Sequence, residues 1–99
     1  MARFSVFANP DGPGFLLDVQ ADLLANLNTR VVVPLIPLDE APVPARTLNP
    51  IFQVEGVTVV MVSQFLAAVP EKILKKPLGS LDGFRQEITA ALDLLFQGF

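Results

Sequence analysis

Cysteine and histidine are both absent from the 99-residue sequence. Without cysteine the chain can form neither a disulfide nor a thiolate metal site. Without histidine it lacks the commonest metal ligand and the commonest general base. The glycines form neither a G-x-G-x-x-G nor a Walker pattern, the usual signatures of nucleotide binding. The sequence therefore predicts no metal site, no cofactor and no histidine-activated nucleophile.

Positive charge is also scarce. The chain carries 7 basic and 10 acidic residues, which gives a net charge of −3. Proteins that bind nucleic acids usually present a dense basic face. The one basic cluster, Lys72, Lys75 and Lys76, follows Glu71 and is typical of a solvated loop. We therefore expect no direct binding to DNA or RNA.

Long apolar runs are missing as well. The longest, Val31 to Leu38 and Val57 to Val62, are far shorter than the roughly 20 residues that span a bilayer. After Arg3 only a few apolar residues precede the turn-forming segment Asn9 to Gly14, a pattern unlike that of a signal peptide. These features predict a cytoplasmic protein with no membrane partner.

Apolar residues are nevertheless abundant, at 52% of the chain, and the mean hydropathy is +0.52. A chain of this length is expected to form one domain, residues 1–99, that buries only about 60 to 68% of its unfolded surface. Surplus apolar surface on a small chain without disulfides usually lies in a subunit interface. We therefore expect a homodimer.

Five short segments have the alternating or β-branched composition of strands. They cover residues 4–7, 15–20, 30–36, 51–54 and 57–62. Pro34 has no N–H to give to a neighbouring strand, so we expect it at a sheet edge or a bulge. In the second segment the alternation places Leu17 and Val19 on one face and Leu16 and Asp18 on the other.

Local signals are clearest in the middle and at the end of the chain. Glu55-Gly56 joins two strand segments with glycine second, which is the spacing of a tight primed hairpin turn. Residues 63–68 break the strand alternation and predict a short helical turn that ends at Pro70. Asp82 is the expected N-cap of a final helix. The apolar face of that helix would contain Phe84, Ile88, Leu92, Leu95 and Phe99.

No catalytic arrangement is evident. Ser5, Ser63 and Ser80 have no histidine to activate them. Asp18 and Asp22 are the nearest pair of carboxylates, but their spacing fits neither one strand face nor a metal-binding loop, so we expect surface or capping roles for both. The sequence predicts a protein that is not an enzyme; a turnover lost on changing either aspartate would revive that alternative.

Three stretches together resemble the CcdB toxins of bacterial toxin–antitoxin systems: FLLDVQADLLANLNTRVVVPL, LNPIFQVEGVTVVMVSQFLAAVP and ITAALDLLFQGF. Shared features are D-V-Q followed by a small residue, aspartate and two aliphatics, then V-(β-branched)-P-L, then a final F-x-G-(apolar). They occur in the family's order and spacing, and the resemblance runs nearly end to end. Strands followed by one helix already indicate an α+β or mainly β class. The resemblance implies an SH3-like barrel of antiparallel strands with one C-terminal α-helix.

The resemblance also implies an activity. CcdB proteins are homodimers, with their C-terminal helices near the two-fold axis, that bind the DNA gyrase A subunit and trap gyrase with cleaved DNA. A partner antitoxin, here a CcdA-like protein, binds the toxin through a disordered segment and removes it from gyrase. Toxin and antitoxin together repress their shared operon.

Gyrase contacts are implied near both chain ends and after the second strand segment. The positions are Arg3, Phe4, Ala21, Leu23, Leu24, Asp93, Gln97, Gly98 and Phe99. Gln97 stands where the family has a tryptophan, and Asp93 replaces an asparagine that can also donate a hydrogen bond. Taken alone, the patterns around Phe4, Leu23 and Leu24 favour core positions for these side chains.

Antitoxin contacts are implied in two loops. They involve Asn9, Asp11 and Gly12 in the first loop, and Asp39 and Glu40 in the acidic proline-rich loop. Because Gln97 removes an aromatic anchor, a second hypothesis stays open. The chain would then be a CcdB-like dimer that binds an antitoxin and regulates its operon without poisoning gyrase, or that has another target.

Overall fold

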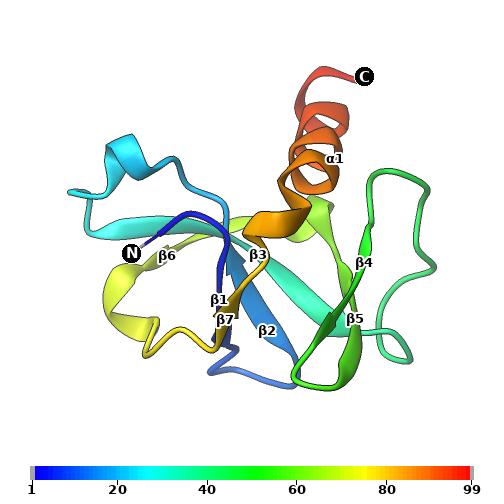
Figure 1. Ribbon diagram of the computed structural model, residues 1–99, viewed down its shortest axis with the longest axis horizontal. Coiled ribbons are helices and arrows are strands. Elements are labelled where there is room, and N and C mark those ends of the chain that lie inside the picture. The colour runs from blue at the N-terminus through cyan, green and yellow to red at the C-terminus, as the bar shows by residue number, and fades with distance from the viewer. Residues whose placement is uncertain (1, 99) are drawn as a thin grey trace.

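The computed structural model describes residues 2–98, which form a curled antiparallel sheet with one helix at its C-terminal end (Figure 1). The strands are β1 (Ser5–Ala8), β2 (Phe15–Asp18), β3 (Thr29–Pro37), β4 (Ile51–Val54), β5 (Val57–Met61), β6 (Ala67–Pro70) and β7 (Gly79–Ser80). The helical segments are the 3-10 turns η1 (Asp22–Leu24), η2 (Ser63–Phe65), η3 (Glu71–Ile73) and η4 (Asp82–Phe84), and the helix α1 (Arg85–Gln97). This half-barrel with one C-terminal helix confirms the predicted mainly β, α+β class with an SH3-like barrel.

The strand order is β4-β5-β3-β2-β1-β7, and β6 pairs with β3 beside β5. β3 is therefore central: it pairs with β2 on one side, and with β6 and then β5 on the other. Pro34 lies where the partner changes from β6 to β5, and its carbonyl oxygen accepts a hydrogen bond from the Val62 N–H at 3.1 Å. Pro34 is therefore not on an edge strand, one of the two expectations, although it does lie at an interruption of the pairing on one side of β3. Its missing N–H would face the gap between two partner strands, so the ladder loses nothing there.

Apolar side chains cover both faces of the sheet. The larger core lies between the sheet and α1 and includes Phe4, Val6, Leu17, Val33, Leu35, Phe52, Met61, Leu81, Ile88, Ala91 and Leu92. The smaller core lies on the other face and consists of Phe7, Leu16, Val32 and Leu74. Both faces of β2 and β3 are therefore buried, which the alternating pattern of the sequence did not predict.

The local signals had mixed outcomes. The hairpin is confirmed: Val54 pairs with Val57, and Glu55 and Gly56 have φ values of 51° and 77°, as a type I′ turn requires. The helical turn is present as η2, but Pro70 does not end it, because residues 67–70 form β6 and pair with β3.

The final helix begins later than predicted, at Arg85. The predicted N-cap role of Asp82 is wrong, since Asp82 lies in η4 and its carboxylate instead pairs with Arg85 at 2.6 Å. Ile88 and Leu92 are buried as predicted, whereas Leu95 is only half-buried. Phe84 is exposed at one edge while its ring packs 5.2 Å from that of Phe52. No helix within residues 2–98 is long and apolar enough to cross a membrane.

Candidate functional site

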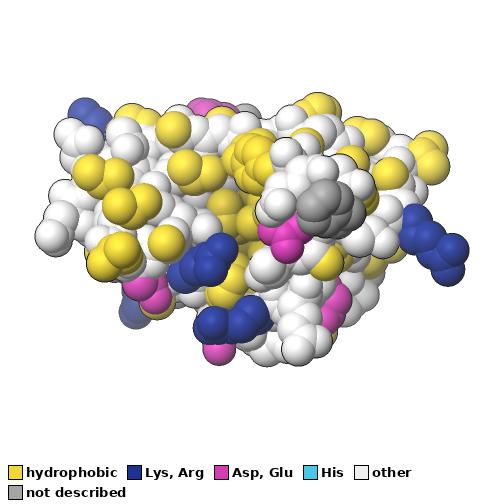
Figure 2. All heavy atoms as spheres, turned by 90° about the horizontal axis from the view of Figure 1, so that it is seen from above, with side chains coloured by type: hydrophobic (Ala, Val, Ile, Leu, Met, Phe, Trp, Pro, Cys, Tyr) yellow, Lys and Arg dark blue, Asp and Glu magenta, His cyan; other side chains and the backbone are white. Residues whose placement is uncertain are grey.

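An open groove of about 570 Å³ lies between η1 and α1. It is lined by Arg3, Val19, Gln20, Ala21, Leu24, Leu27, Thr29, Val31, Leu66, Leu92, Asp93 and Phe96. Figure 2 looks down on this side of the molecule and shows hydrophobic side chains in the hollow, with basic side chains beside them. The lining is mostly apolar, and Arg3 and Asp93 are its charged groups. Such a surface suits an apolar side chain of a partner that also offers polar groups at the rim.

The groove brings together residues that are far apart in the sequence. Four of the positions implied by the family resemblance line it. Arg3 precedes β1, Ala21 precedes η1, Leu24 is the last residue of η1, and Asp93 lies on α1. Leu23, the middle residue of η1, does not line the groove and is 91% exposed.

Gln97 and Gly98 are exposed at the end of α1, one helical turn beyond Asp93. Gly98 has φ 80° and its N–H donates to the Leu94 carbonyl at 3.0 Å, which is the usual left-handed end of a helix. Phe99, the remaining residue of the implied set, lies outside the described residues.

Phe4 occupies a different environment. Its side chain has no exposed surface and belongs to the larger core, as the strand pattern alone favoured. The guanidinium of Arg3 lies 4.7 Å from the centre of the Phe4 ring, and that of Arg85 lies 5.4 Å from it. Phe4 therefore reaches the groove only through Arg3, which stacks on the ring while lining the groove.

Sequence reasoning missed six apolar residues of the groove: Val19, Leu27, Val31, Leu66, Leu92 and Phe96. Phe96 had a usable signal, because it is a large aromatic four residues after Leu92 and so extends that side of α1 beyond the core. It is 67% exposed. Leu27 and Leu66 had no such signal, since only the folded chain brings them to the same groove.

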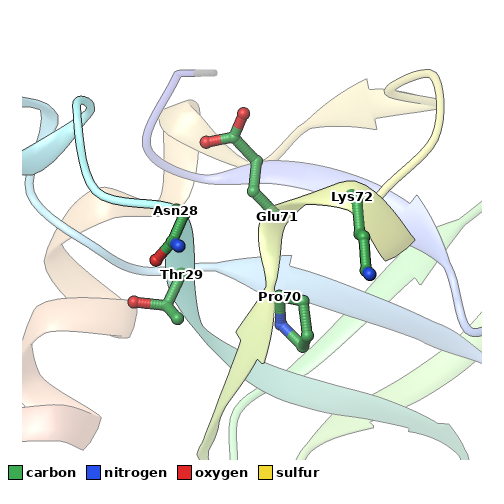
Figure 3. Close-up of a pocket in the computed structure, with 5 residues that line it drawn as sticks. All are labelled: Asn28, Thr29, Pro70, Glu71 and Lys72. Atoms are coloured by element: carbon green, nitrogen blue, oxygen red, sulfur yellow. The ribbon is translucent and has the colours of Figure 1, made fainter.

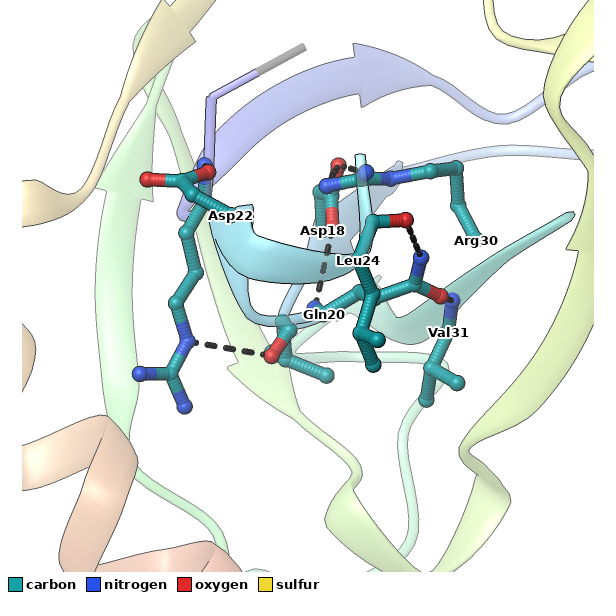
Figure 4. A network of polar contacts seen from close by, with 8 residues as sticks. Asp18, Gln20, Asp22, Leu24, Arg30 and Val31 are labelled. Carbon is teal, nitrogen blue, oxygen red and sulfur yellow. Dashed lines mark hydrogen bonds and ion pairs between the residues drawn. The ribbon is translucent and has the colours of Figure 1, made fainter. Parts of the chain in front are cut away.

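Beneath η1 lies a buried ion pair (Figure 4). Arg30 donates from Nε to Asp18 Oδ2 at 2.8 Å, and its Nη2 lies 2.7 Å from the same oxygen without its hydrogens being aimed at it. Burial raises the pKa of the Asp18 carboxyl, although the hydrogen bond from Arg30 acts in the opposite direction. The surface role predicted for Asp18 is wrong, because the second core covers its face of β2. The surface role predicted for Asp22 is confirmed; its Oδ1 accepts from the Arg3 N–H at 2.8 Å.

The positions implied for antitoxin binding lie elsewhere. Asn9, Asp11 and Gly12 are in the β1–β2 loop, where Asn9 Oδ1 accepts from the Asp11 N–H at 2.9 Å. Asp39 and Glu40 are exposed just after β3. The start of β2 and the end of β3 lie together, because Phe15 pairs with Leu35. Both loops are therefore at the opposite end of these strands from η1.

A second hollow, of about 490 Å³, is lined by Asn28, Thr29, Pro70, Glu71 and Lys72 (Figure 3). The side chains of Glu71 and Lys72 point in different directions, so the hollow has no set of polar groups aimed at one point. Within residues 2–98, no group of three or more acidic side chains is placed to hold a metal ion. The groove between η1 and α1 is accordingly the stronger candidate.

The sequence matches the family described as CcdB protein over residues 3–98. The chain belongs to the CcdB family. CcdB proteins are toxins of toxin–antitoxin systems, and this is a family of toxins rather than a known family of enzymes. A comparison with curated proteins gave no significant match.

Proposed function

We propose that this CcdB-family chain is a toxin that binds the DNA gyrase A subunit and traps gyrase on cleaved DNA. It acts by binding alone, as a homodimer in the cytoplasm, with no catalytic step and no cofactor. A CcdA-like antitoxin neutralises it through the loops that carry Asn9, Asp11, Gly12, Asp39 and Glu40, and represses the shared operon with it.

One observation carries the proposal: Arg3, Ala21, Leu24 and Asp93 line a single groove. The groove adjoins the exposed end of α1, where Gln97 and Gly98 lie. An apolar groove with charged groups at its rim is a typical site for an anchor residue of a partner protein. We place the gyrase contact there, with Leu23 as an exposed apolar contact beside it.

A second candidate function rests on Gln97. Glutamine has no ring to stack on a partner, and an aromatic anchor at an interface centre is worth roughly 2 kcal/mol or more. The alternative is a CcdB-family dimer that still binds its antitoxin and regulates the operon without poisoning gyrase, or that binds another target. Phe96 lies in the groove and offers an aromatic surface one residue earlier, which favours the gyrase poison.

The deciding experiment combines the purified protein with gyrase, ATP and supercoiled plasmid, and measures linear DNA after detergent and protease. The full chain should release linear DNA, and a chain lacking residues 97–99 should release much less. No linear DNA at a large excess of folded protein would favour the regulatory alternative.

A matched pair of surface variants locates the contact. Leu23 and Val43 are both 91% exposed, so Leu23→Ser and Val43→Ser should leave the fold equally intact. If the contact includes the groove, Leu23→Ser should raise the protein concentration needed for half-maximal cleavage by about tenfold, the effect of losing about 1.4 kcal/mol. Val43→Ser should leave that concentration unchanged. If the two variants change the concentration for half-maximal cleavage equally, the gyrase contact does not include η1.

A further inference from the structure

Gln20 is a buried amide at the point where β2 ends and the segment carrying η1 begins. The residue is 7% exposed, and its backbone N–H and both polar atoms of its side chain form hydrogen bonds (Figure 4). The N–H donates to Asp18 Oδ1 at 3.0 Å, Nε2 donates to the Leu24 carbonyl at 3.1 Å, and Oε1 accepts from the Val31 N–H at 3.0 Å. The side chain thus ties the last residue of η1 to the central strand.

The contact with Val31 replaces a bond of the sheet. The Val19 N–H donates to the Val31 carbonyl at 3.0 Å, and an antiparallel ladder would return the Val31 N–H to the Val19 carbonyl. Gln20 Oε1 takes that N–H instead. The Val19 carbonyl is then available to Arg3, whose Nε donates to it at 3.1 Å. Gln20 therefore ends the β2–β3 ladder and, in doing so, provides the acceptor that holds Arg3 at the groove.

The 3-10 turn itself has few other attachments. None of the residues of η1 is buried, and no side chain caps it. Its own backbone bonds, from Leu24 to Ala21 and from Ala25 to Asp22, stay within the segment. Within residues 2–98, two side-chain hydrogen bonds join it to the body of the protein: Gln20 to the Leu24 carbonyl, and the Arg3 N–H to Asp22 Oδ1. Both bonds involve groups that Gln20 positions directly or through the Val19 carbonyl.

We propose that Gln20 is a positioning residue that fixes η1 and Arg3 relative to α1 and so presents Leu23 and Leu24 to the partner protein. The role in partner binding rests on the proposed function; the role in fixing η1 does not. Because η1 contributes no buried side chain to either core, loosening it should change partner binding much more than it changes global stability.

We call the two side-chain hydrogen bonds of Gln20, to the Leu24 carbonyl and from the Val31 N–H, the Gln20 clamp. Two variants test these two hydrogen bonds separately. Gln20→Glu keeps an oxygen that can accept from Val31 but loses the N–H that donates to Leu24. Gln20→Leu loses both. The control is Gln53→Leu, which removes an amide that donates to Thr58 Oγ1 at 2.6 Å in the exposed β4–β5 hairpin.

Amide hydrogen exchange measures the clamp without any partner. The amides of Leu24, Ala25 and Leu27 should exchange at least severalfold faster in both Gln20 variants, whereas the Val31 amide should lose protection only in Gln20→Leu. The free energy of unfolding, measured in parallel by urea, identifies any variant that has lost its overall fold. Unchanged exchange of the η1 amides in both folded variants would overturn the proposal.

The gyrase assay then measures the consequence. Gln20→Glu should need about tenfold more protein for half-maximal cleavage, and Gln53→Leu should match the unsubstituted protein. Faster η1 exchange with unchanged cleavage would overturn the role of Gln20 in partner binding. If the unsubstituted protein releases no linear DNA, the gyrase proposal fails separately, and the exchange of the η1 amides alone decides whether Gln20 fixes the turn.

Discussion

At the residue scale, the Asp18–Arg30 pair combines full burial with incomplete hydrogen bonding. Both side chains are 0% exposed, and Arg30 Nη1 has no hydrogen-bond partner among the described residues. Removing two charges from water is costly, and the attraction between them offsets the cost only when the geometry is good. We infer that the pair contributes little net stability and serves to fix the Asp18 carboxylate, whose other oxygen accepts from the Gln20 N–H.

Removing the buried guanidinium of Arg30 should lower the free energy of unfolding much more than breaking an exposed ion pair does. Arg30→Met leaves the Asp18 carboxylate buried without its counter-charge, so the free energy of unfolding at pH 7 should fall by about 3 kcal/mol or more. Asp82→Asn is the control, since it breaks the exposed pair with Arg85 and should cost less than about 1 kcal/mol. Urea denaturation measures both, and similar small losses would show that Asp18 does not need Arg30.

The pH dependence of stability tests the state of Asp18. In the unfolded chain its carboxyl has a pKa near 3.8, whereas burial raises the pKa in the folded protein. Between these two values the folded state binds more protons, so the contribution of this group to stability falls as pH rises. This stabilising contribution of Asp18 is fully present below pH 3.8 and is lost as the pH rises through the pKa of Asp18 in the folded protein.

Asp18→Asn removes this titration and keeps an Oδ1 acceptor for Gln20. The free energy of unfolding of the unsubstituted protein minus that of Asp18→Asn should therefore decrease from pH 3.5 upward. Urea titrations across the acid range provide the difference. A difference that increases with pH would mean that the attraction of Arg30 outweighs burial.

At the element scale, the features predicted correctly are those that neighbouring residues determine. The Glu55-Gly56 turn is fixed by its two residues and by the strands on either side. β6 was missed because Ala67 to Pro70 become a strand only by pairing with β3. The second core was missed for a similar reason: only in the folded chain do Val69, Ile73 and Leu74 pack against the face of β2 that carries Leu16.

Part of the candidate site could also be predicted from the sequence, whereas part of it depends on the fold. Arg3, Ala21, Leu24 and Asp93 followed from the family resemblance, and the structure brings them to one groove. The clamp by Gln20 could not follow from the alternation, because its function depends on distances to Leu24 and Val31 that only the fold sets.

Three glycines in turns predict a graded series of alanine variants. Gly56 has φ +77° with open space around its Cβ position, so Gly56→Ala should lower the free energy of unfolding by about 1–2 kcal/mol through backbone strain. At Gly14, with φ +90°, a Cβ would also collide with the Leu35 carbonyl oxygen, so the loss should be larger. Gly12 has neither constraint, and Gly12→Ala should be close to neutral. Thermal or urea unfolding gives the order, and a costly Gly12→Ala would contradict this account.

At the scale of the whole molecule, a small chain exposes many large apolar side chains. They include Leu23, Leu24, Leu27, Leu38, Val43, Ile51, Val57, Phe65, Leu78, Phe84 and Phe96. Single exposed apolar residues are common in monomers, but contiguous ones mark interaction sites. Leu24, Leu27 and Phe96 line the η1–α1 groove, and the others lie outside it. The proposed gyrase contact at this groove would therefore account for only part of the exposed apolar surface.

The rest of this surface is the physical reason to expect a homodimer. Because association stabilises the folded chain by mass action, Tm should rise as the protein concentration rises. Sedimentation should give a mass near twice the 10.7 kDa of the chain, with dissociation only on dilution. If η1 contacts gyrase and does not contact the other subunit of the dimer, Leu23→Ser should leave the sedimentation mass and the concentration dependence of Tm unchanged. A mass of one chain with a constant Tm over a hundredfold range of concentration would contradict the dimer, and the apolar surface outside the groove would then have to serve the antitoxin or another partner.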